Sequence, residues 1–357
     1  MIAFYVHHHG SGHLARTVSV VEQLTGPAAV LTSLDIAEAS LPSNAVLVRL
    51  PPDTRSDAER TADITAHGAL HWAPIGSGEL TARTRSLVEW LTGTPPRLLV
   101  VDMSVEVLVQ ARLCGIATVA VRYHGRRDDR GHQLGYDCAT ELLAPYPREF
   151  EDPSTPANIA GRTFYGGLYS LQSGRRLSLS TARLQCRLGE TDRVLAIAVG
   201  SGGTGLDLDT ARSLAHVLPG WTIRVIGADG QPSADGSVRF EGWVDDPFPW
   251  LRAANVVAAS AGANLTAVAA AGVPFLAIVE ERPFEEQARR AEQLRHHGAA
   301  ATSDGWPSLS DWPAKIDLAL ELGATKLTQW ASEADPAVVA EWLESIAAKN
   351  TSPDPPA

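Results

Sequence analysis

Two glycine-rich turns, each directly after a short apolar strand, carry the residue types in this chain that are best suited to ligand chemistry. The first turn is residues 7–13 (HHHGSGH) and the second is residues 200–205 (GSGGTG). A strand that ends at glycines before a helix brings backbone N–H groups and the positive helix end against a ligand, often a phosphate. Two such turns, at the start of two similar halves, predict two nucleotide-binding folds with a cleft between them.

The first turn supplies a candidate general base, His13. It stands at the start of a predicted helix, directly after residues 10–12 (GSG). An imidazole with an unshifted pKa of about 6.5 is partly neutral near pH 7 and can accept a proton there. Asp102 follows the predicted strand 97–101. It is a rival base or the carboxylate that orients His13, and it could equally cap the helix that follows.

A charged segment that begins with Arg122 and continues through His124 follows the predicted strand 116–121. Site residues collect at the carboxyl ends of parallel strands. An arginine at that place suits an acidic acceptor or the phosphates of a donor. We therefore expect Arg122 and His124 to contact an acceptor, with a solvated charged loop as the alternative.

Four segments of the second half are predicted to meet at the carboxyl ends of a parallel sheet, where ligands of open α/β sheets bind. They share glycines, small residues or polar side chains next to a helix start: 200–205, 240–246 (FEGWVDD), 260–264 (SAGAN) and 285–287 (EEQ). Each one alone is most simply a structural turn or cap. Their order within one array of strands and helices favours a joint ligand site.

The first half alternates strand and helix patterns, which predicts a parallel sheet covered on both faces. Apolar runs predict the strands, and helical spacing of apolar residues predicts the helices between them. The predicted strands are 2–6, 28–31, 45–50, 97–101 and 116–121, and the predicted helices are 14–24, 79–91 and 105–113. Residues 51–78 show no clear period, and a loop of that length in a compact domain is usually functional or mobile.

The same pattern restarts after residues 151–174, which are rich in Pro, Ser, Asn and Gly. The predicted strands are 194–199, 222–226, 237–240, 256–259 and 275–279, and the predicted helices are 208–217, 247–253, 264–271 and 284–295. We expect a first domain at 1–160 and a second at 175–330. A helix within 331–349 is expected to pack back on the first domain, and 350–357 to form a disordered tail.

Composition excludes several classes of protein. The chain has 357 residues, of which 45% are hydrophobic, enough for two domains with their own cores. A net charge of −11 argues against nucleic-acid binding and against a basic membrane-docking face. No apolar run approaches the ~20 residues that span a bilayer, and the start lacks a basic leader, so we expect a cytoplasmic protein. Three scattered cysteines (Cys114, Cys138 and Cys186) predict reduced thiols and no metal site. The Lys-poor usage, rich in Ala, Arg, Gly and Pro, is typical of a high-GC bacterium.

The order of these segments resembles the donor domain of GT-B glycosyltransferases. The residues that carry the resemblance are Gly200-Ser201-Gly202-Gly203, then 240–246, then 260–264 continuing to 269–274 (AAAGVP), and Glu286-Gln287. The likeness is greatest to the family 28 type, which includes the peptidoglycan lipid-intermediate N-acetylglucosaminyltransferase and the macrolide glycosyltransferases. The Gly10-x-Gly12-His13-x-x-Arg16 segment is similar to the acceptor loop of this group, so the resemblance covers roughly residues 1–300.

The resemblance implies a role for each matching residue. It implies that Trp243 and Val244 hold the base through their main chain and that Glu286 and Gln287 bind the hydroxyls of the donor sugar. The residues implied to face the diphosphate are Gly200, Ser201, Gly202, Gly203, Thr204, Ser260, Gly262, Ala263 and Asn264. The residues implied to form the acceptor loop are Gly10, Ser11 and Gly12, with His13 as a candidate base.

One departure from the family pattern concerns the ribose. The family often has a Glu five residues before the Gly of the Gly-Val-Pro segment, where this chain has Ala267, and Asn264 stands where a Thr is usual. Ribose recognition is therefore expected to differ. Thymidine or guanosine diphosphate sugars stay open beside uridine diphosphate sugars.

We therefore expect an α/β protein of the GT-B class, with two Rossmann-like, doubly wound parallel-sheet domains facing a central cleft. The resemblance implies an inverting hexosyl or N-acetylhexosaminyl transferase that needs neither metal nor cofactor, with His13 as general base. It would move a sugar, most often from a UDP-sugar, to a hydroxyl or amine of a soluble acceptor such as a metabolite or antibiotic core, as in bacterial secondary metabolism. The alternatives are a non-catalytic nucleotide-sugar-binding partner of another transferase and a sugar-nucleotide epimerase or hydrolase of the same fold.

Overall fold

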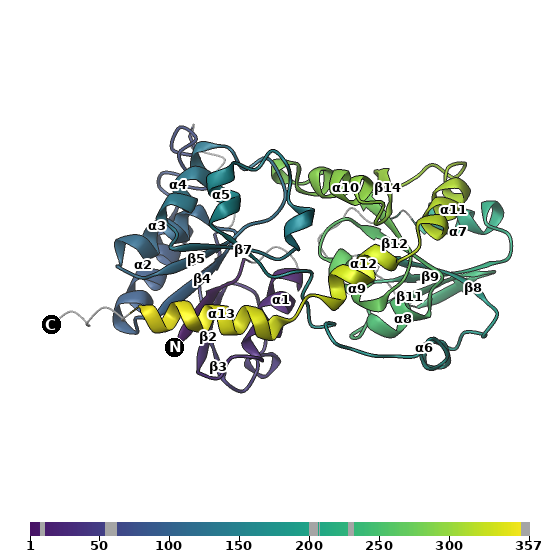
Figure 1. Ribbon diagram of the computed structural model, residues 1–357, viewed down its shortest axis with the longest axis horizontal. Helices are drawn as coiled ribbons and strands as arrows, with labels where there is room; N and C mark the ends of the chain where they lie inside the picture. The colour runs from purple at the N-terminus through teal and green to yellow at the C-terminus, as the bar shows by residue number, and fades with distance from the viewer. Residues whose placement is uncertain (8–10, 54–62, 200–205, 207, 228–231, 351–357) are drawn as a thin grey trace. The chain divides into compact units, whose positions relative to one another are not determined.

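The computed structural model describes residues 1–7, 11–53, 63–199, 206, 208–227 and 232–350. The chain divides into two compact units (Figure 1). The first contains Met1–Tyr146, Ser154–Gly166 and the chain from Pro336 onward, and the second contains Pro147–Pro153 and Gly167–Asp335. The predicted first domain, 1–160, contained residues 147–153, which the structure instead places in the second unit.

The first unit is built on a seven-stranded parallel sheet with the order β3-β2-β1-β4-β5-β6-β7. Its strands are β1 Ile2–Tyr5, β2 Ala28–Thr32, β3 Ala45–Arg49, β4 Leu98–Asp102, β5 Thr118–Val121, β6 Glu141–Ala144 and β7 Thr163–Tyr165. Strand β1 pairs with β2 on one side and with β4 on the other. The central strands β1, β2 and β4 are buried along their whole length, which explains their continuous apolar runs.

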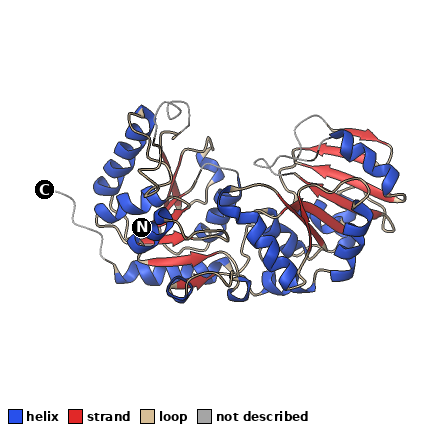
Figure 2. Ribbon diagram, turned by 90° about the horizontal axis from the view of Figure 1, so that it is seen from above, coloured by secondary structure: helices blue, strands red, loops and turns tan. Residues whose placement is uncertain are grey.

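Helices lie on both faces of this sheet (Figure 2). They are α1 Ser11–Val21, α2 Gly78–Gly93, α3 Val105–Leu113, α4 Arg130–Cys138, α5 Ala157–Gly161 and α13 Pro336–Lys349, with a 3-10 turn η1 at Glu38–Ser40. Three of them start where a side-chain oxygen accepts a hydrogen bond from a free backbone N–H of the first turn. The capping residues are Ser77 for α2, Ser104 for α3 and Asp129 for α4.

The C-terminal helix α13 belongs to the first unit and packs against α1. The Trp342 ring stacks on Phe164 of β7 with their centroids 4.3 Å apart. The Glu344 carboxylate accepts hydrogen bonds from the backbone N–H and the hydroxyl of Thr25, at 2.8 and 2.7 Å. These contacts join the end of the chain to its beginning.

The second unit repeats the architecture with the strand order β10-β11-β9-β8-β12-β13-β14. Its strands are β8 Arg193–Ala198, β9 Trp221–Ile226, β10 Ser233–Asp235, β11 Val238–Gly242, β12 Val256–Ser260, β13 Phe275–Val279 and β14 Ala301–Asp304. Only β10 runs antiparallel to its neighbour among the described pairs. Its helices are α6 Leu179–Gln185, α7 Leu208–Val217, α8 Phe248–Ala253, α9 Asn264–Ala271, α10 Glu286–His296, α11 Trp312–Leu322 and α12 Thr325–Ser332, with 3-10 turns η3 Arg148–Phe150 and η4 Pro283–Glu285.

The excursion of residues 147–153 into the second unit has a packing cause. Phe150 is completely buried and its ring lies 4.7 Å from the ring of Trp330 on α12. Lys326 donates a 2.9 Å hydrogen bond to Glu149, which also accepts one from the Trp330 indole. An aromatic side chain and an ion pair thus anchor the segment.

Both sheets have the doubly wound, Rossmann-like topology that the sequence predicts. In each, the first strand of the unit lies beside a strand from the later half: β1 beside β4, and β8 beside β12. At such a reversal of strand order the connecting helices cover opposite faces, and a crevice opens at the carboxyl ends of the two strands. No helix of the described residues is both long enough and apolar enough to traverse a bilayer.

The docking of α13 predicts a position-dependent loss of stability. Leu343 is fully buried and Val338, on the same helix, is 52% exposed. We expect Leu343→Ala to lower the free energy of unfolding by about 2–5 kcal/mol, because it leaves a cavity. Val338→Ala is the matched control and should change it by less than about 0.5 kcal/mol. Urea unfolding followed by circular dichroism measures both, and equal effects would show that α13 does not pack through this face.

Candidate functional site

His13 and Asp102 meet at the strand reversal of the first sheet. His13 lies in the first turn of α1, which follows β1, and Asp102 is the last residue of the neighbouring strand β4. The Nδ1 atom of His13 lies 2.8 Å from Oδ2 of Asp102. The His13 side chain is 20% exposed and that of Asp102 only 6%. The imidazole is therefore reachable from solvent while its carboxylate partner is buried.

Two further side chains complete this group. The Tyr123 hydroxyl donates a 2.7 Å hydrogen bond to Oδ1 of Asp102, and Arg16 donates a 2.6 Å hydrogen bond to the same hydroxyl. The Arg16 guanidinium also lies over the Tyr123 ring, 5.1 Å from its centroid. We call His13, Asp102, Tyr123 and Arg16 the His13 network. Every oxygen of its buried carboxylate has a hydrogen-bond partner.

The surroundings of Asp102 keep it ionised. Burial by itself raises the pKa of this carboxyl, but the charge and hydrogen bond of His13 lower it, as do the charge of Arg16 and the hydrogen bond of Tyr123. The balance holds the pKa of Asp102 below its ordinary value of 3.8. An ionised Asp102 takes the proton on Nδ1 of His13 as its hydrogen-bond donor, which leaves Nε2 as the basic nitrogen.

The backbone next to Asp102 is strained. Met103 has a φ of 64°, in the left-handed region that residues with a Cβ rarely adopt. This conformation lies between the end of β4 and Ser104, whose hydroxyl accepts a 3.3 Å hydrogen bond from the Val107 N–H to cap α3. The tight turn lets Asp102 face His13 while the cap of α3 is supplied by the serine. Asp102 is therefore not the cap of this helix, which resolves one of the sequence alternatives.

Tyr123 is the member of the network that sequence reasoning missed, although both of its neighbours were predicted as acceptor contacts. Arg122 is buried, and its guanidinium donates to the hydroxyls of Thr155 and Thr163 at 3.3 and 3.5 Å. His124 is also buried, with its ring 4.1 Å from that of Tyr146. These described contacts of Arg122 and His124 are with residues outside the His13 network. Alternation along an extended segment could have shown that residues 122 and 124 point one way and Tyr123 the other.

Two of the remaining predicted acceptor residues directly precede His13 in helix α1. Ser11 and Gly12 form the start of α1. Gly10 lies outside the described residues. The first turn of α1, which contains His13, offers backbone N–H groups as donors, since the first four N–H groups of a helix have no partner within it.

In the second unit, two of the predicted segments lie together after the neighbouring strands β12 and β13. Ser260 ends β12, and Asn264 begins α9, with its side-chain amide 3.5 Å from the Ser260 hydroxyl. Gln287, in the first turn of α10, is 3% exposed, and its Oε1 accepts a 2.8 Å hydrogen bond from the Glu280 N–H. Its Nε2 lies 3.3 Å from where a Cβ on Gly262 would stand. The glycine thus lets the turn after β12 approach the amide of Gln287.

Arg290 also connects the segments 260–264 and 285–287 through hydrogen bonds. Arg290 donates a 2.7 Å hydrogen bond to the carbonyl of Ala261 and a 2.9 Å hydrogen bond to the Glu286 carboxylate. The two residues before Glu286, Phe284 and Glu285, both have positive φ, 60° and 55°. Residues other than glycine are strained at positive φ, and such strained residues are found most often at functional sites. The helix predicted from 284 therefore begins at Glu286.

For the other predicted donor residues, the structure gives only their position and exposure, or does not describe them. Trp243 directly follows β11 and is 64% exposed, and Val244 is partly buried. Ala263 lies at the exposed N-terminal end of α9. The five residues Gly200, Ser201, Gly202, Gly203 and Thr204 lie outside the described part of the chain.

No protein-family model matches this sequence, and neither does any curated protein. The fold, in contrast, is similar to solved glycosyltransferases over almost the whole chain. The spinosyn rhamnosyltransferase SpnG complexed with thymidine diphosphate has a TM-score of 0.70 and 18% identity, covering 96% of this chain and 100% of that one. The glycosyltransferase SnogD from Streptomyces nogalater has a TM-score of 0.65 and 15% identity, covering 97% and 99%. MurG of Acinetobacter baumannii has a TM-score of 0.63 and 15% identity, covering 96% and 99%. The chain has the GT-B fold.

The resemblance drawn from the sequence is thus confirmed at the level of the fold. Within this GT-B chain, His13 and the segment 260–264 both lie where the strand order of a sheet reverses. A crevice at that position is where ligands of open α/β sheets bind. The roles of individual residues stay predictions.

One further group of titratable residues in the GT-B chain could hold a metal ion. It consists of His71, Asp129 and His132. Burial lowers the pKa of His132 to about 4, helped by the charge of Arg127 and opposed by Asp129. Burial raises the pKa of Asp129, but hydrogen bonds from His132 and His71 outweigh this and hold it well below its usual range. The spacing of 58 residues between His71 and Asp129 gave no signal in the sequence.

The lowered pKa of Asp102 predicts a pH-dependent contribution to stability. At pH 7 the carboxylate is ionised and paired, so Asp102→Asn should lower the free energy of unfolding by about 1–3 kcal/mol. A lowered folded-state pKa gives stability that is present above the ordinary pKa and is lost as the pH falls through the folded-state value. The difference between the two proteins, measured by urea unfolding, should therefore shrink as the pH falls from about 5 to about 3. A difference that stays constant over this range would contradict the assignment.

Proposed function

We propose that this protein is an inverting glycosyltransferase in which His13 is the general base. One observation carries the proposal: an imidazole that is 20% exposed is oriented by a buried carboxylate at the strand reversal of a GT-B chain. The proposed reaction moves a hexosyl or N-acetylhexosaminyl group from a nucleoside diphosphate sugar to a hydroxyl or amine of an acceptor.

In the proposed reaction, Nε2 of His13 takes the proton of the acceptor hydroxyl. The acceptor oxygen forms a bond to the anomeric carbon on the face opposite the diphosphate. The bond from that carbon to the diphosphate oxygen breaks, and its electron pair leaves with the nucleoside diphosphate. Attack from the opposite face inverts the anomeric configuration. A positioned base of this kind contributes about 10²–10⁴-fold to such a rate.

Asp102 acts through His13 in this proposal and is a positioning residue. One carboxylate oxygen contacts His13 and the other accepts from Tyr123, so neither is directed at an acceptor. The carboxylate keeps the proton on Nδ1 and stabilises the imidazolium that forms when Nε2 is protonated. This division of roles favours His13 over Asp102 as the base, a choice that the sequence left open.

The donor is proposed to bind the second unit. The N-terminus of α9 and the segment 200–204 would face the diphosphate, because N–H groups at a helix start bind anions. Trp243 and Val244 would hold the base, and Glu286 and Gln287 the sugar hydroxyls. UDP-sugars are our first choice, and TDP-sugars come next because the similar SpnG is complexed with thymidine diphosphate. Neither a metal nor a cofactor takes part in the proposed step.

The acceptor is proposed to be a soluble metabolite or antibiotic core of a bacterial cytoplasm. The acidic net charge of −11 supports a soluble acceptor over one held at an anionic membrane surface. The full-length protein is incubated with a panel of UDP-, TDP- and GDP-sugars, and free nucleoside diphosphate is measured with and without acceptor extract. Acceptor-dependent release supports the transferase. Tight binding without turnover would instead support a non-catalytic partner, and a changed sugar on the recovered nucleotide an epimerase.

His13→Ala should remove most turnover, by about 10²–10⁴-fold, while donor binding survives. Nucleotide release measures the first effect, and thermal shift with the nucleoside diphosphate measures the second. His67→Ala is the matched control, because its side chain is 91% exposed and pairs only with Asp63 among the ion pairs of the described residues. Wild-type turnover in His13→Ala would reassign the base.

Gln287→Ala should weaken donor binding and broaden the choice of sugar. The loss removes an amide that the Glu280 N–H holds in place beside the turn at Gly262. The measurement compares turnover with several sugars on the same nucleotide. Gln329→Ala, an exposed position of α12, serves as control. An unchanged sugar preference in Gln287→Ala would remove this residue from the donor site.

A further inference from the structure

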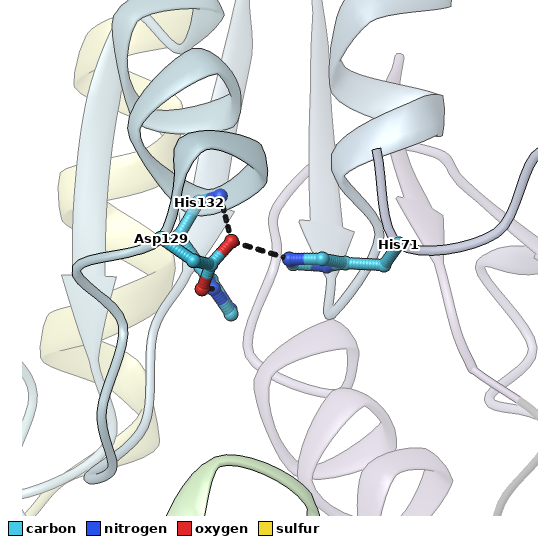
Figure 3. Close-up of side chains that lie close together, drawn as sticks. All are labelled: His71, Asp129 and His132. Atoms are coloured by element: carbon cyan, nitrogen blue, oxygen red, sulfur yellow. Dashed lines mark hydrogen bonds and ion pairs between the residues drawn. The ribbon is translucent and has the colours of Figure 1, made fainter. Parts of the chain in front are cut away.

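A second group of titratable side chains lies outside the residues used in the proposed transfer. In this group the Asp129 carboxylate contacts the rings of both His71 and His132 (Figure 3), and the two ring centroids are 4.3 Å apart. Its Oδ1 is 2.8 Å from Nε2 of His71, and its Oδ2 is 2.5 Å from Nδ1 of His132. All the candidate ligand atoms lie within 4.8 Å of one another. Within the described ranges, no other three His, Cys, Asp or Glu side chains converge in this way.

Helix α4 positions two of the three residues. Asp129 is its N-cap and accepts a 3.1 Å hydrogen bond from the backbone N–H of His132. His132 therefore lies in the first turn, with its ring directed back to the carboxylate. Its side chain is only 8% exposed, so its geometry is set by the packing of the helix.

The third residue, His71, is held in place by the Glu106 side chain, which does not belong to α4. The Glu106 carboxylate of α3 accepts hydrogen bonds from the N–H groups of His71 and Trp72, at 2.7 and 3.0 Å. Ser104, the cap of α3, donates a 3.0 Å hydrogen bond to the same carboxylate. These hydrogen bonds to Glu106 fix the backbone at His71. Gly131 provides the space, because a Cβ there would stand 2.7 Å from Nε2 of His71.

We propose that His71, Asp129 and His132 bind a divalent transition metal ion, with Zn²⁺ as its simplest representative. Two imidazoles and one carboxylate are a donor set that such ions prefer. Each imidazole nitrogen would move about 0.5–1 Å away from the Asp129 oxygen it now contacts, because tetrahedral ligands with bonds of about 2.0–2.2 Å lie about 3.3–3.6 Å apart. His71 and Asp129 are 26% and 35% exposed, so solvent reaches the group. Three protein ligands leave a coordination position open for water or another ligand.

Arg127 competes with the metal, and this competition makes the proposal testable. Its Nη1 lies 2.9 Å from Nε2 of His132 and can only donate, so in the metal-free protein the proton of His132 is on Nδ1. A metal on Nδ1 moves this proton to Nε2, where it faces the guanidinium. Arg127 must then turn away, although its Nε also donates to the carbonyls of Tyr123 and His124. Metal-binding histidines normally donate their second N–H to an acceptor.

The metal site does not rest on the proposed function. It shares no residue with the His13 network, and its test measures binding directly. A failure of sugar transfer therefore leaves the metal site standing, and the absence of metal binding leaves the transferase standing.

The experiment titrates Zn²⁺ into the chelator-treated full-length protein by isothermal calorimetry, with visible absorption of bound Co²⁺ as a second readout. We expect one ion per chain and a tetrahedral or five-coordinate Co²⁺ spectrum. His132→Ala and Asp129→Asn should weaken binding by more than about 100-fold. Arg127→Gln should tighten it about tenfold, because the glutamine carbonyl can accept the Nε2 proton.

His67→Ala, in the same segment as His71, is the matched control and should bind as the wild type does. Circular dichroism checks that each variant is folded. The proposal is overturned if the wild type binds no stoichiometric Zn²⁺, or if binding survives in both His132→Ala and Asp129→Asn. It is also overturned if Arg127→Gln leaves a measurable Zn²⁺ affinity unchanged. If the three side chains only hydrogen-bond to one another, the loss of Arg127 predicts no gain of metal binding.

Discussion

The buried carboxylate of Asp102 places the strongest constraint on the first unit. An ionised carboxyl away from water is costly unless charge and hydrogen bonds compensate it. His13 and Tyr123 supply the hydrogen bonds, and Arg16 adds its positive charge through the Tyr123 hydroxyl. These partners follow β1 and β5, the strands on either side of β4. Compensation therefore requires the doubly wound strand order, and the same order exposes the imidazole at the edge where ligands bind.

The second unit uses the same topological position with different chemistry. The turn after β12 and the start of α10 are joined by Arg290 and by the close approach of Gln287 to Gly262. These groups offer amides, a helix start and an arginine-paired carboxylate. Such groups suit recognition of anions and hydroxyls more than proton transfer. Two similar folds thus place an imidazole paired with a carboxylate at this position in one unit, and amide, helix-start and carboxylate groups in the other.

The two histidine–aspartate groups of the first unit differ in where arginine acts. In the His13 network, Arg16 donates to the Tyr123 hydroxyl, which leaves the second nitrogen of the imidazole basic. In the other group, Arg127 donates to Nε2 of His132 and occupies that nitrogen. The first arrangement suits a general base. In the second, two imidazoles share one carboxylate, and this suits the ligand geometry of a metal ion.

The sequence by itself determined the alternation of strands and helices, the two doubly wound halves and the position of His13 and Asp102 at strand ends. These features depend on local apolar periodicity and on glycine-rich turns, which are properties of neighbouring residues. Tertiary structure alone decided that Tyr123 meets Asp102, and that 147–153 packs on Trp330. It also brought His71 to Asp129 and set the strained start of α10. Contacts between side chains 58 or 89 residues apart depend on strand order and on which face each side chain takes, and neither is encoded in a local pattern.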